Sequence, residues 1–309
     1  MSSKLKVGQL VMGNPQNLNP VDPREKLDLP SLGSMPQISG VGTSIVRIIA
    51  PNASHMTLDG TNTYLISDPI SGSAVMIDPG PDSDSHLNSV RQVLIAHQVE
   101  LVGILLTHHH LDHSETAAKW ANLFGVGVSA RREKLVLGPG KLLVEGDIIQ
   151  LGSRHLQVIE TPGHVDDHLG FIIDDEFLFT GDHILGRSTS VISYPDGNVE
   201  KYLDSLAKVK QIGPRTILPG HGPVVSESIS TEVIDYYIAH RLYRIEQIIS
   251  QLEANPVIGS DDLTRLIYGD ALPEPLFLPA MQSTRAALKY LLEIGQVEAD
   301  NRGRYRLSG

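Results

Sequence analysis

The chain has 309 residues, a formal charge of −11 at pH 7 and no cysteine. This length allows one large domain and a small second one. The missing cysteine excludes disulfides, thiolate metal sites and thiol nucleophiles, so any bound metal would need His, Asp or Glu ligands. The negative charge argues against a broad nucleic-acid surface, because such surfaces cluster Lys and Arg.

No membrane span or secretory signal is expected. The first residues show no apolar core followed by a small-residue cleavage site, and no window reaches the roughly 18 apolar residues that a span requires. We therefore expect a soluble, cytoplasmic protein with no membrane partner.

Residues 1–40 contain five prolines and little periodicity, which predicts an extended arm that is laid on the body or partly disordered. From residue 44 the pattern changes to short β-branched runs bounded by Gly, Pro and Asp, which are typical of strands. Apolar residues at helical spacing predict a helix over 84–99. Strands are expected at 44–49, 62–66, 74–78, 102–106, 156–160, 170–173 and 176–180, and further helices near 114–124 and 199–211. Interleaved strands and helices predict an α/β fold.

A second pattern begins near residue 231. A long amphipathic helix is expected over 231–254, followed by helices at 260–269 and 279–294. Two short strands then flank a turn at 301–303, and this outline predicts a winged-helix-like module. Four residues share one face of the long helix, and we expect a solvated hinge there in preference to a groove for an anionic substrate. They are Tyr237, His240, Arg241 and Arg244.

Histidine and aspartate side chains follow four predicted strands, each where the strand ends. The run 108–113 (HHHLDH) is followed later in the chain by His164, Asp182 and His221. Loops at strand ends present side chains at one edge of a sheet, so we expect these residues to converge. Imidazole and carboxylate ligands suit zinc, although Mn or Fe can occupy similar sites.

The H-x-H-x-D-H motif of His108, His110, Asp112 and His113 resembles the metallo-β-lactamase superfamily. The resemblance spans roughly 44–245 and implies an αββα sandwich, here followed by a small C-terminal winged-helix-like domain. We expect three parts with separate roles. They are an N-terminal arm (1–40), a metallo-β-lactamase domain (41–230), and a linker helix with the winged-helix-like domain (231–309).

The resemblance also implies a ligand set for two Zn²⁺ ions, with Mn²⁺ or Fe²⁺ as alternatives. His108, His110 and His164 would hold the first metal, and Asp182 would bridge both. The second metal would be held by Asp112, His113 and His221. A metal-bridging hydroxide would then be the nucleophile, because each metal lowers the pKa of bound water.

Two residues are predicted to be catalytic. Asp112 would orient the hydroxide as well as bind metal. His168 would either reach the cleft rim and donate a proton to a leaving group or oxyanion, or orient a ligand from behind. His109 is expected to point away from the metals, and His183 is expected to pack behind the bridging Asp182.

Motifs outside the ligands narrow the subfamily. The segments 56–64 (MTLDGTNTY), 161–168 (TPGHVDDH) and 180–186 (TGDHILG) look like the β-lactamase-like protein 2 group. That resemblance implies a thioesterase or a single-strand endoribonuclease. The bridging Asp182 and the absence of cysteine argue against hydrolysis of β-lactam antibiotics, and His110 argues against the flavodiiron branch, which has Glu there.

We expect a zinc-dependent hydrolase acting on a small-molecule ester or acyl-thioester. The alternatives are an endoribonuclease with single-stranded RNA as partner, a mono-iron sulfur dioxygenase, and a non-catalytic binding scaffold. From residue 231 the chain has roughly eleven acidic and eight basic residues, a net charge of about −3. This balance favours a lid or an element of a homodimer over a reader of nucleic acid.

Overall fold

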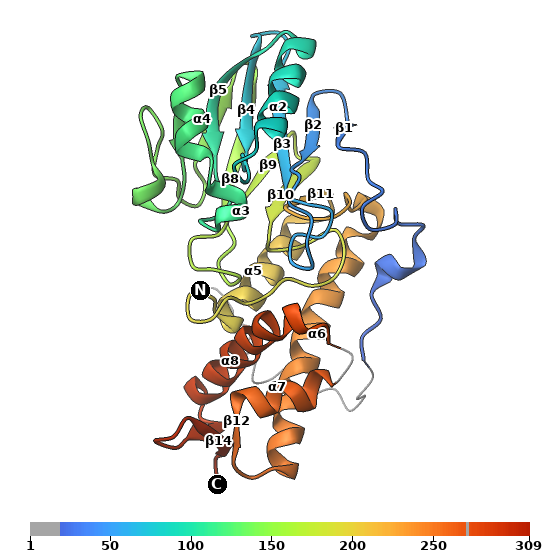
Figure 1. Cartoon of the computed structure of the whole chain (residues 1–309), viewed down its shortest axis with the longest axis vertical. Helices are drawn as coiled ribbons and strands as arrows, with labels where there is room; N and C mark the ends of the chain where they lie inside the picture. Colours follow the sequence, from blue (N-terminus) through green and yellow to red (C-terminus); the bar gives the residue numbers. More distant parts are fainter. Residues whose placement is uncertain (1–18, 270–271) are drawn as a thin grey trace.

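The computed structural model describes residues 19–269 and 272–309 (Figure 1). The beginning of the predicted arm, residues 1–18, lies outside the described residues. Two β-sheets lie face to face, and helices cover their outer surfaces. This layered α/β arrangement confirms the predicted fold class.

The first sheet has the strand order β1-β2-β3-β4-β5-β6. Strands β1 to β4 pair antiparallel, whereas β4, β5 and β6 are parallel. Parallel neighbours need a crossover connection, which α2 (Asp84–His97) and α4 (Ala117–Phe124) supply. The strands are β1 (Ile38–Val41), β2 (Ile45–Ile49), β3 (Asn62–Asp68), β4 (Ser73–Ile77), β5 (Glu100–Leu105) and β6 (Gly127–Ser129).

The second sheet has the order β11-β10-β9-β8-β7 and is antiparallel except for the β10–β11 pair. Its outer face is covered by α5 (Val199–Ile212) and by the helices that follow β11. An apolar cluster between the sheets joins Tyr64 and Ile66 of the first sheet to Phe171 and Phe179 of the second. The strands are β7 (Ile148–Leu151), β8 (Arg154–Glu160), β9 (Leu169–Ile173), β10 (Phe177–Gly181) and β11 (Thr216–Pro219).

The helix expected over 114–124 is two helices, α3 (Leu111–Ser114) and α4. The ladder of i to i−4 hydrogen bonds is interrupted at Thr116, whose N–H and hydroxyl both donate to the carbonyl of Gly80. These bonds tie α3 to the end of β4. The strands β1, β6 and β7 were not predicted, because β1 and β7 are half exposed and β6 has only three residues.

The C-terminal part lies below the two sheets in the view of Figure 1. Helix α6 (Glu227–Ala254) begins four residues before the predicted start, because Ser226 caps it by accepting the N–H of Ser228. Three short strands form a sheet in the order β12-β14-β13. The remaining elements are β12 (Ile258–Gly259), α7 (Ser260–Tyr268), α8 (Phe277–Glu293), β13 (Val297–Ala299) and β14 (Arg304–Leu307).

The expected solvated stripe on this long helix is wrong. Tyr237, His240 and Arg241 are buried. The guanidinium carbon of Arg244 lies 4.3 Å from the centre of the Tyr268 ring. The face is covered because α6 packs against α5, α7 and α8. Helical spacing alone does not show how many neighbours a helix has.

The described part of the N-terminal arm lies on the body. It includes a short 3-10 helix, Pro23–Lys26, and the side chain of Arg24 is 1% exposed. Arg24 donates to the carbonyls of Leu185 and Ser188, which lie in the loop between β10 and α5. Two further 3-10 turns occur at Glu133–Leu135 and Glu274–Leu276. No helix in the described part of the chain is long and apolar enough to cross a membrane.

Candidate metal centre

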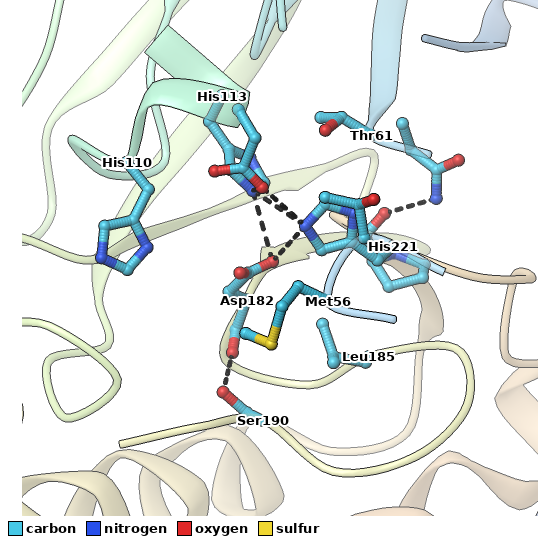
Figure 2. Close-up of polar contacts among 12 residues, drawn as sticks. Met56, Thr61, His110, His113, Asp182, Leu185, Ser190 and His221 are labelled. Carbon is cyan, nitrogen blue, oxygen red and sulfur yellow. Dashed lines mark hydrogen bonds and ion pairs between the residues drawn. The ribbon is translucent and has the colours of Figure 1, made fainter. Parts of the chain in front are cut away.

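The seven predicted ligands converge at one edge of the two sheets, on loops that follow β5, β8, β10 and β11 and on α3. They form two groups of ligand atoms. The first group contains His108, His110, His164 and Asp182, and the second contains Asp112, His113 and His221. Figure 2 shows Asp182 between His113, His221 and His110.

Imidazole nitrogens of the first group lie close together. His110 Nδ1 is 3.0 Å from His108 Nε2 and 3.1 Å from His164 Nε2. In the second group, His221 Nε2 is 3.2 Å from His113 Nε2 and 3.2 Å from Asp112 Oδ2. Ligands of a tetrahedral zinc ion at about 2.0 Å stand about 3.3 Å apart, so both groups have the required spacing.

Asp182 faces both groups with one carboxylate oxygen each. Its Oδ1 lies 3.4 Å from His113 Nε2 and 3.3 Å from His221 Nε2. Its Oδ2 lies 3.7 Å from His164 Nε2 and 4.0 Å from His108 Nε2. This is the position that a carboxylate bridging two cations would occupy.

Hydrogen bonds on the far side of four rings fix their tautomers. His113 Nδ1 donates to Asp78 Oδ2 at 2.8 Å, and His164 Nδ1 donates to the carbonyl of Val191 at 2.6 Å. His221 Nδ1 faces the carbonyl of Gly60 at 3.2 Å, and His108 Nδ1 faces Thr107 Oγ1 at 3.0 Å. With Nδ1 protonated, each Nε2 presents a lone pair to the centre.

These atoms fit two cations. Lone pairs of several buried nitrogens point at one another at about 3 Å, and within the described residues Asp182 Oδ1 accepts no hydrogen bond although it is buried. Converging acceptors without a donor are costly unless a positive charge lies between them. A set of five imidazoles and two carboxylates suits zinc, manganese or iron.

Charge at the centre shifts the pKa values of the ligands. Burial would lower the pKa of His113, but the carboxylates of Asp112, Asp182 and Asp78 hold it well above its usual value. Without a cation His113 Nε2 therefore holds a proton, which a bound cation would replace, so the centre favours positive charge at this position. Burial would raise the pKa of Asp112, yet His113 and His221 bring it down to about 2. Asp112 is therefore ionised at neutral pH and available as a ligand or proton acceptor.

Asp78 was not singled out from the sequence, although it connects both groups. Its carboxylate accepts hydrogen bonds from Thr107 N, Thr107 Oγ1 and His113 Nδ1 at 2.7–2.8 Å. Thr107 Oγ1 in turn accepts from His108 Nδ1. Asp78 directly follows β4, so the rule that located the other ligands, a carboxylate where a strand ends, would also have found it.

Close packing at the centre requires glycine at position 220. A Cβ on Gly220 would lie 2.7 Å from Asp182 Oδ1 and 2.8 Å from His113 Cε1. The backbone after β11 can therefore approach the carboxylate only without a side chain. Gly181 has a φ of +46°, and a Cβ at this position would lie 2.8 Å from His168 Nε2.

The structure places His168 behind the centre instead of at a cleft rim. It is 1% exposed, its Nδ1 lies 2.8 Å from Thr161 Oγ1, and its Nε2 accepts the backbone N–H of Asp182 at 3.1 Å. A proton donor needs access to the substrate, and both ring nitrogens of His168 already have protein partners. This geometry favours the second expectation, that His168 positions a ligand, here Asp182.

His109 and His183, which are next to ligands in the sequence, lie outside the ligand groups. His109 turns away from the centre and its Nδ1 lies 2.7 Å from Asp167 Oδ1. His183 is fully buried against the ring of Tyr202, with ring centroids 4.9 Å apart, and burial lowers its pKa to about 3. Both positions agree with the structural roles expected for these residues.

Apolar side chains line one side of the centre. Met56, which is 44% exposed, extends toward Asp182 in Figure 2, and Leu185 lies below it. Ser190 Oγ donates to the backbone carbonyl of Asp182. Met56 and Leu185 lie in loops after β2 and β10 and were not predicted, because a single apolar residue in a loop carries no sequence signal.

A layered αββα fold with two groups of candidate metal ligands and an aspartate that faces both is typical of a class of metalloproteins. The profile of the metallo-beta-lactamase superfamily matches residues 56–221, which include every predicted ligand. The chain belongs to this superfamily.

Relatives of similar length carry a more specific name. A beta-lactamase-like protein 2 homolog of Caenorhabditis elegans is 30% identical over 278 residues, covering 87% of this chain and 91% of the relative. A protein of the same name from Drosophila melanogaster is 31% identical over 280 residues, covering 85% and 92%. These similarities confirm the resemblance to the β-lactamase-like protein 2 group.

Solved structures share the fold. A beta-lactamase domain protein from Burkholderia ambifaria matches with a TM-score of 0.74 at 21% identity, covering 96% of this chain and 99% of that protein. A metallo-beta-lactamase family protein from Thermus thermophilus matches with a TM-score of 0.72 at 20% identity, covering 85% and 98%. At this distance the match establishes the architecture of the chain.

Proposed function

We propose that this protein is a hydrolase that uses two divalent cations, zinc in the first instance, and acts on an ester or thioester. The observation that carries the proposal is the position of Asp182, whose two carboxylate oxygens face different ligand groups. Cations held in this way supply an activated water and polarise the bond to be cleaved.

The chain's own residues then have separate tasks. The imidazoles of His108, His110 and His164 would hold the first cation, and His113, His221 and Asp112 would hold the second. The side chain of Asp112 is 30% exposed, more than those of Asp182 and Asp78. Its carboxylate would orient the attacking water. His168 keeps Asp182 in place by accepting its backbone N–H.

Charges around the centre support a substrate without phosphates. The two arginines after β6 are already paired: Arg131 with Glu160, and Arg132 with Asp166, Asp167 and Asp196. An RNA substrate would need unpaired cations along its path. Met56, which is exposed, provides an apolar contact suited to an acyl group, and the buried Leu185 lies below it.

The C-terminal part is proposed as a winged-helix-like domain that limits access to the centre. The order of its helices and strands supports this assignment. Arg304 and Arg306 pair with Asp300 and Glu298, which leaves less positive charge for RNA. Homodimer formation through this part and a cytoplasmic location are also proposals.

Metal analysis and a substrate comparison test the function. The purified protein should contain about two zinc ions per chain, and the zinc-loaded protein should hydrolyse acyl-thioesters or esters but not single-stranded RNA. His108→Ala should abolish the activity. Cleavage of RNA that His108→Ala removes would favour the endoribonuclease alternative, and one iron per chain with oxygen uptake would favour a sulfur dioxygenase.

A further inference from the structure

A cluster of charged side chains beside the metal centre has no role in the proposed reaction. His109 Nδ1 lies 2.7 Å from Asp167 Oδ1, and Arg132 Nε lies 3.2 Å from Asp167 Oδ2. Asp167 is buried, with 4% of its side chain exposed, so both of its oxygens are committed to these partners. We call His109, Asp167 and Arg132 the clamp.

The clamp joins the loops that carry the first ligand group. His109 lies between the ligands His108 and His110, and Asp167 lies three residues after the ligand His164. Arg132, shortly after β6, also reaches Asp166 and Asp196 on the surface. The contact between His109 and Asp167 therefore fastens the loop at 108–113 to the loop at 161–168, and the ion pair of Arg132 with Asp167 ties the second loop to the segment after β6.

His110 depends on this connection more than the other ligands. His108, His164, His113 and His221 each have an oxygen behind the ring that fixes its orientation. The hydrogen-bonding contacts of His110 run from its Nδ1 to other ligands, and within the described part of the chain its Nε2 has no oxygen partner. The carbonyl of His110 accepts the N–H groups of His113 and Ser114 in α3, and the clamp adds a side-chain anchor on the preceding residue, His109.

The imidazole rings of the second ligand group are oriented without the clamp. His113 is oriented by Asp78 and His221 by the carbonyl of Gly60, and neither of these contacts involves the clamp. Loosening the clamp should therefore displace His110 relative to His164 without disturbing His113 and His221.

We propose that His109, Asp167 and Arg132 are positioning residues that set the cation affinity of the first group selectively. The inference rests on the two-cation function proposed above. Residues that orient metal ligands through hydrogen bonds typically change metal affinity by about 10- to 100-fold when they are replaced.

The experiment is a zinc titration of the metal-free chain, with Co²⁺ absorption spectra to distinguish the two sites. His110→Ala and His221→Ala assign the spectral bands to the first and second group. Asp167→Ala should weaken the first site by about 10- to 100-fold and leave the second within about twofold. Asp166→Ala, at the 60% exposed partner of the same arginine, should change neither site.

A second pair of variants covers the case in which Asp167→Ala does not fold. Arg132→Gln should weaken the first site, whereas Arg131→Gln, at the neighbouring arginine that pairs with the partly exposed Glu160, should not. Equal weakening of both sites, or no change in either, would overturn the proposal. Failure of the unmodified chain to bind two cations would instead refute the proposed function, so the two failures are distinguishable.

Discussion

The carboxylate of Asp78 orients histidine ligands in both groups of the candidate metal centre. Asp78 orients His113 directly and His108 through Thr107, so it supports one ligand of each group. An amide at this position could not accept all three hydrogen bonds, because its nitrogen is a donor. The role of Asp78 is therefore electrostatic as well as geometric.

Asp78→Asn should lower zinc affinity at both sites by about 10- to 100-fold. Calorimetric titration of the metal-free protein measures the change. Asp84→Asn, on the exposed first turn of α2, is the control and should bind zinc normally. Unchanged affinity in Asp78→Asn would show that Thr107 and the backbone are sufficient to orient the rings.

A buried histidine away from the ligands should make stability depend on pH. Burial lowers the pKa of His86 to about 4, while its Nε2 lies 2.9 Å from Thr63 Oγ1. The unfolded chain binds a proton near pH 6.5, and the folded chain resists protonation until about pH 4. The contribution of His86 to the free energy of unfolding is fully present above about pH 6.5 and is lost as the pH falls toward 4.

The expected loss between pH 7 and pH 4 is about 3 kcal/mol for this one group. His86→Gln should reduce the pH dependence of the unfolding free energy by a similar amount, measured by urea denaturation at several pH values. His155→Gln, at an exposed position, should leave the dependence as it is. An identical slope in His86→Gln and the unmodified chain would contradict this account.

At the scale of elements, the N-terminal arm holds the loop between β10 and α5. Arg24 is buried, donates to the carbonyls of Leu185 and Ser188, and pairs with Asp22 at 2.6 Å. Tyr237 of α6 binds the same loop through Leu185 N. The loop begins at Asp182 and carries Leu185, so it is supported by both the N-terminal arm and α6.

Arg24→Met should destabilise the protein by about 3 kcal/mol, because it leaves buried carbonyls and Asp22 without their partner. We also expect a raised KM for an acyl substrate, since Leu185 would no longer be fixed. Urea denaturation and steady-state kinetics measure the two effects. Lys26→Met on the same 3-10 turn is exposed and should change neither.

At the scale of the whole molecule, one apolar cluster joins the second sheet to the C-terminal part. It includes Leu178 of β10 and Tyr202 of α5 together with Leu288 of α8 and Val297 of β13. Because these residues share a core, the predicted boundary at residue 230 does not separate two independent cores. We expect the two parts to unfold together.

Leu288→Ala should cost about 2–5 kcal/mol, because Leu288 is fully buried and a cavity would remain. A single calorimetric transition should persist at a lower temperature. Leu292→Ala on the same helix is 36% exposed and should cost much less. Two separate transitions in either variant would show that the C-terminal part unfolds independently.

Local sequence patterns were sufficient to predict the α/β class, most of the helices and strands, and the seven candidate ligands. These follow from local rules: periodicity defines an element, and a His or Asp at a strand end lies at the edge of a sheet. The superfamily was accessible for the same reason, since His108 to His113 form a contiguous motif.

The contacts between segments far apart in the chain could not be predicted and became visible in the folded structure. Asp78 and Asp167 bind histidines 35 and 58 residues away, and the buried face of α6 depends on three other helices. His168 lies behind Asp182 because the antiparallel strands β9 and β10 lead away from His168 and back to Asp182. Spacing along the chain predicts which side chains can reach an edge, whereas burial and hydrogen-bond partners depend on what the fold brings beside them.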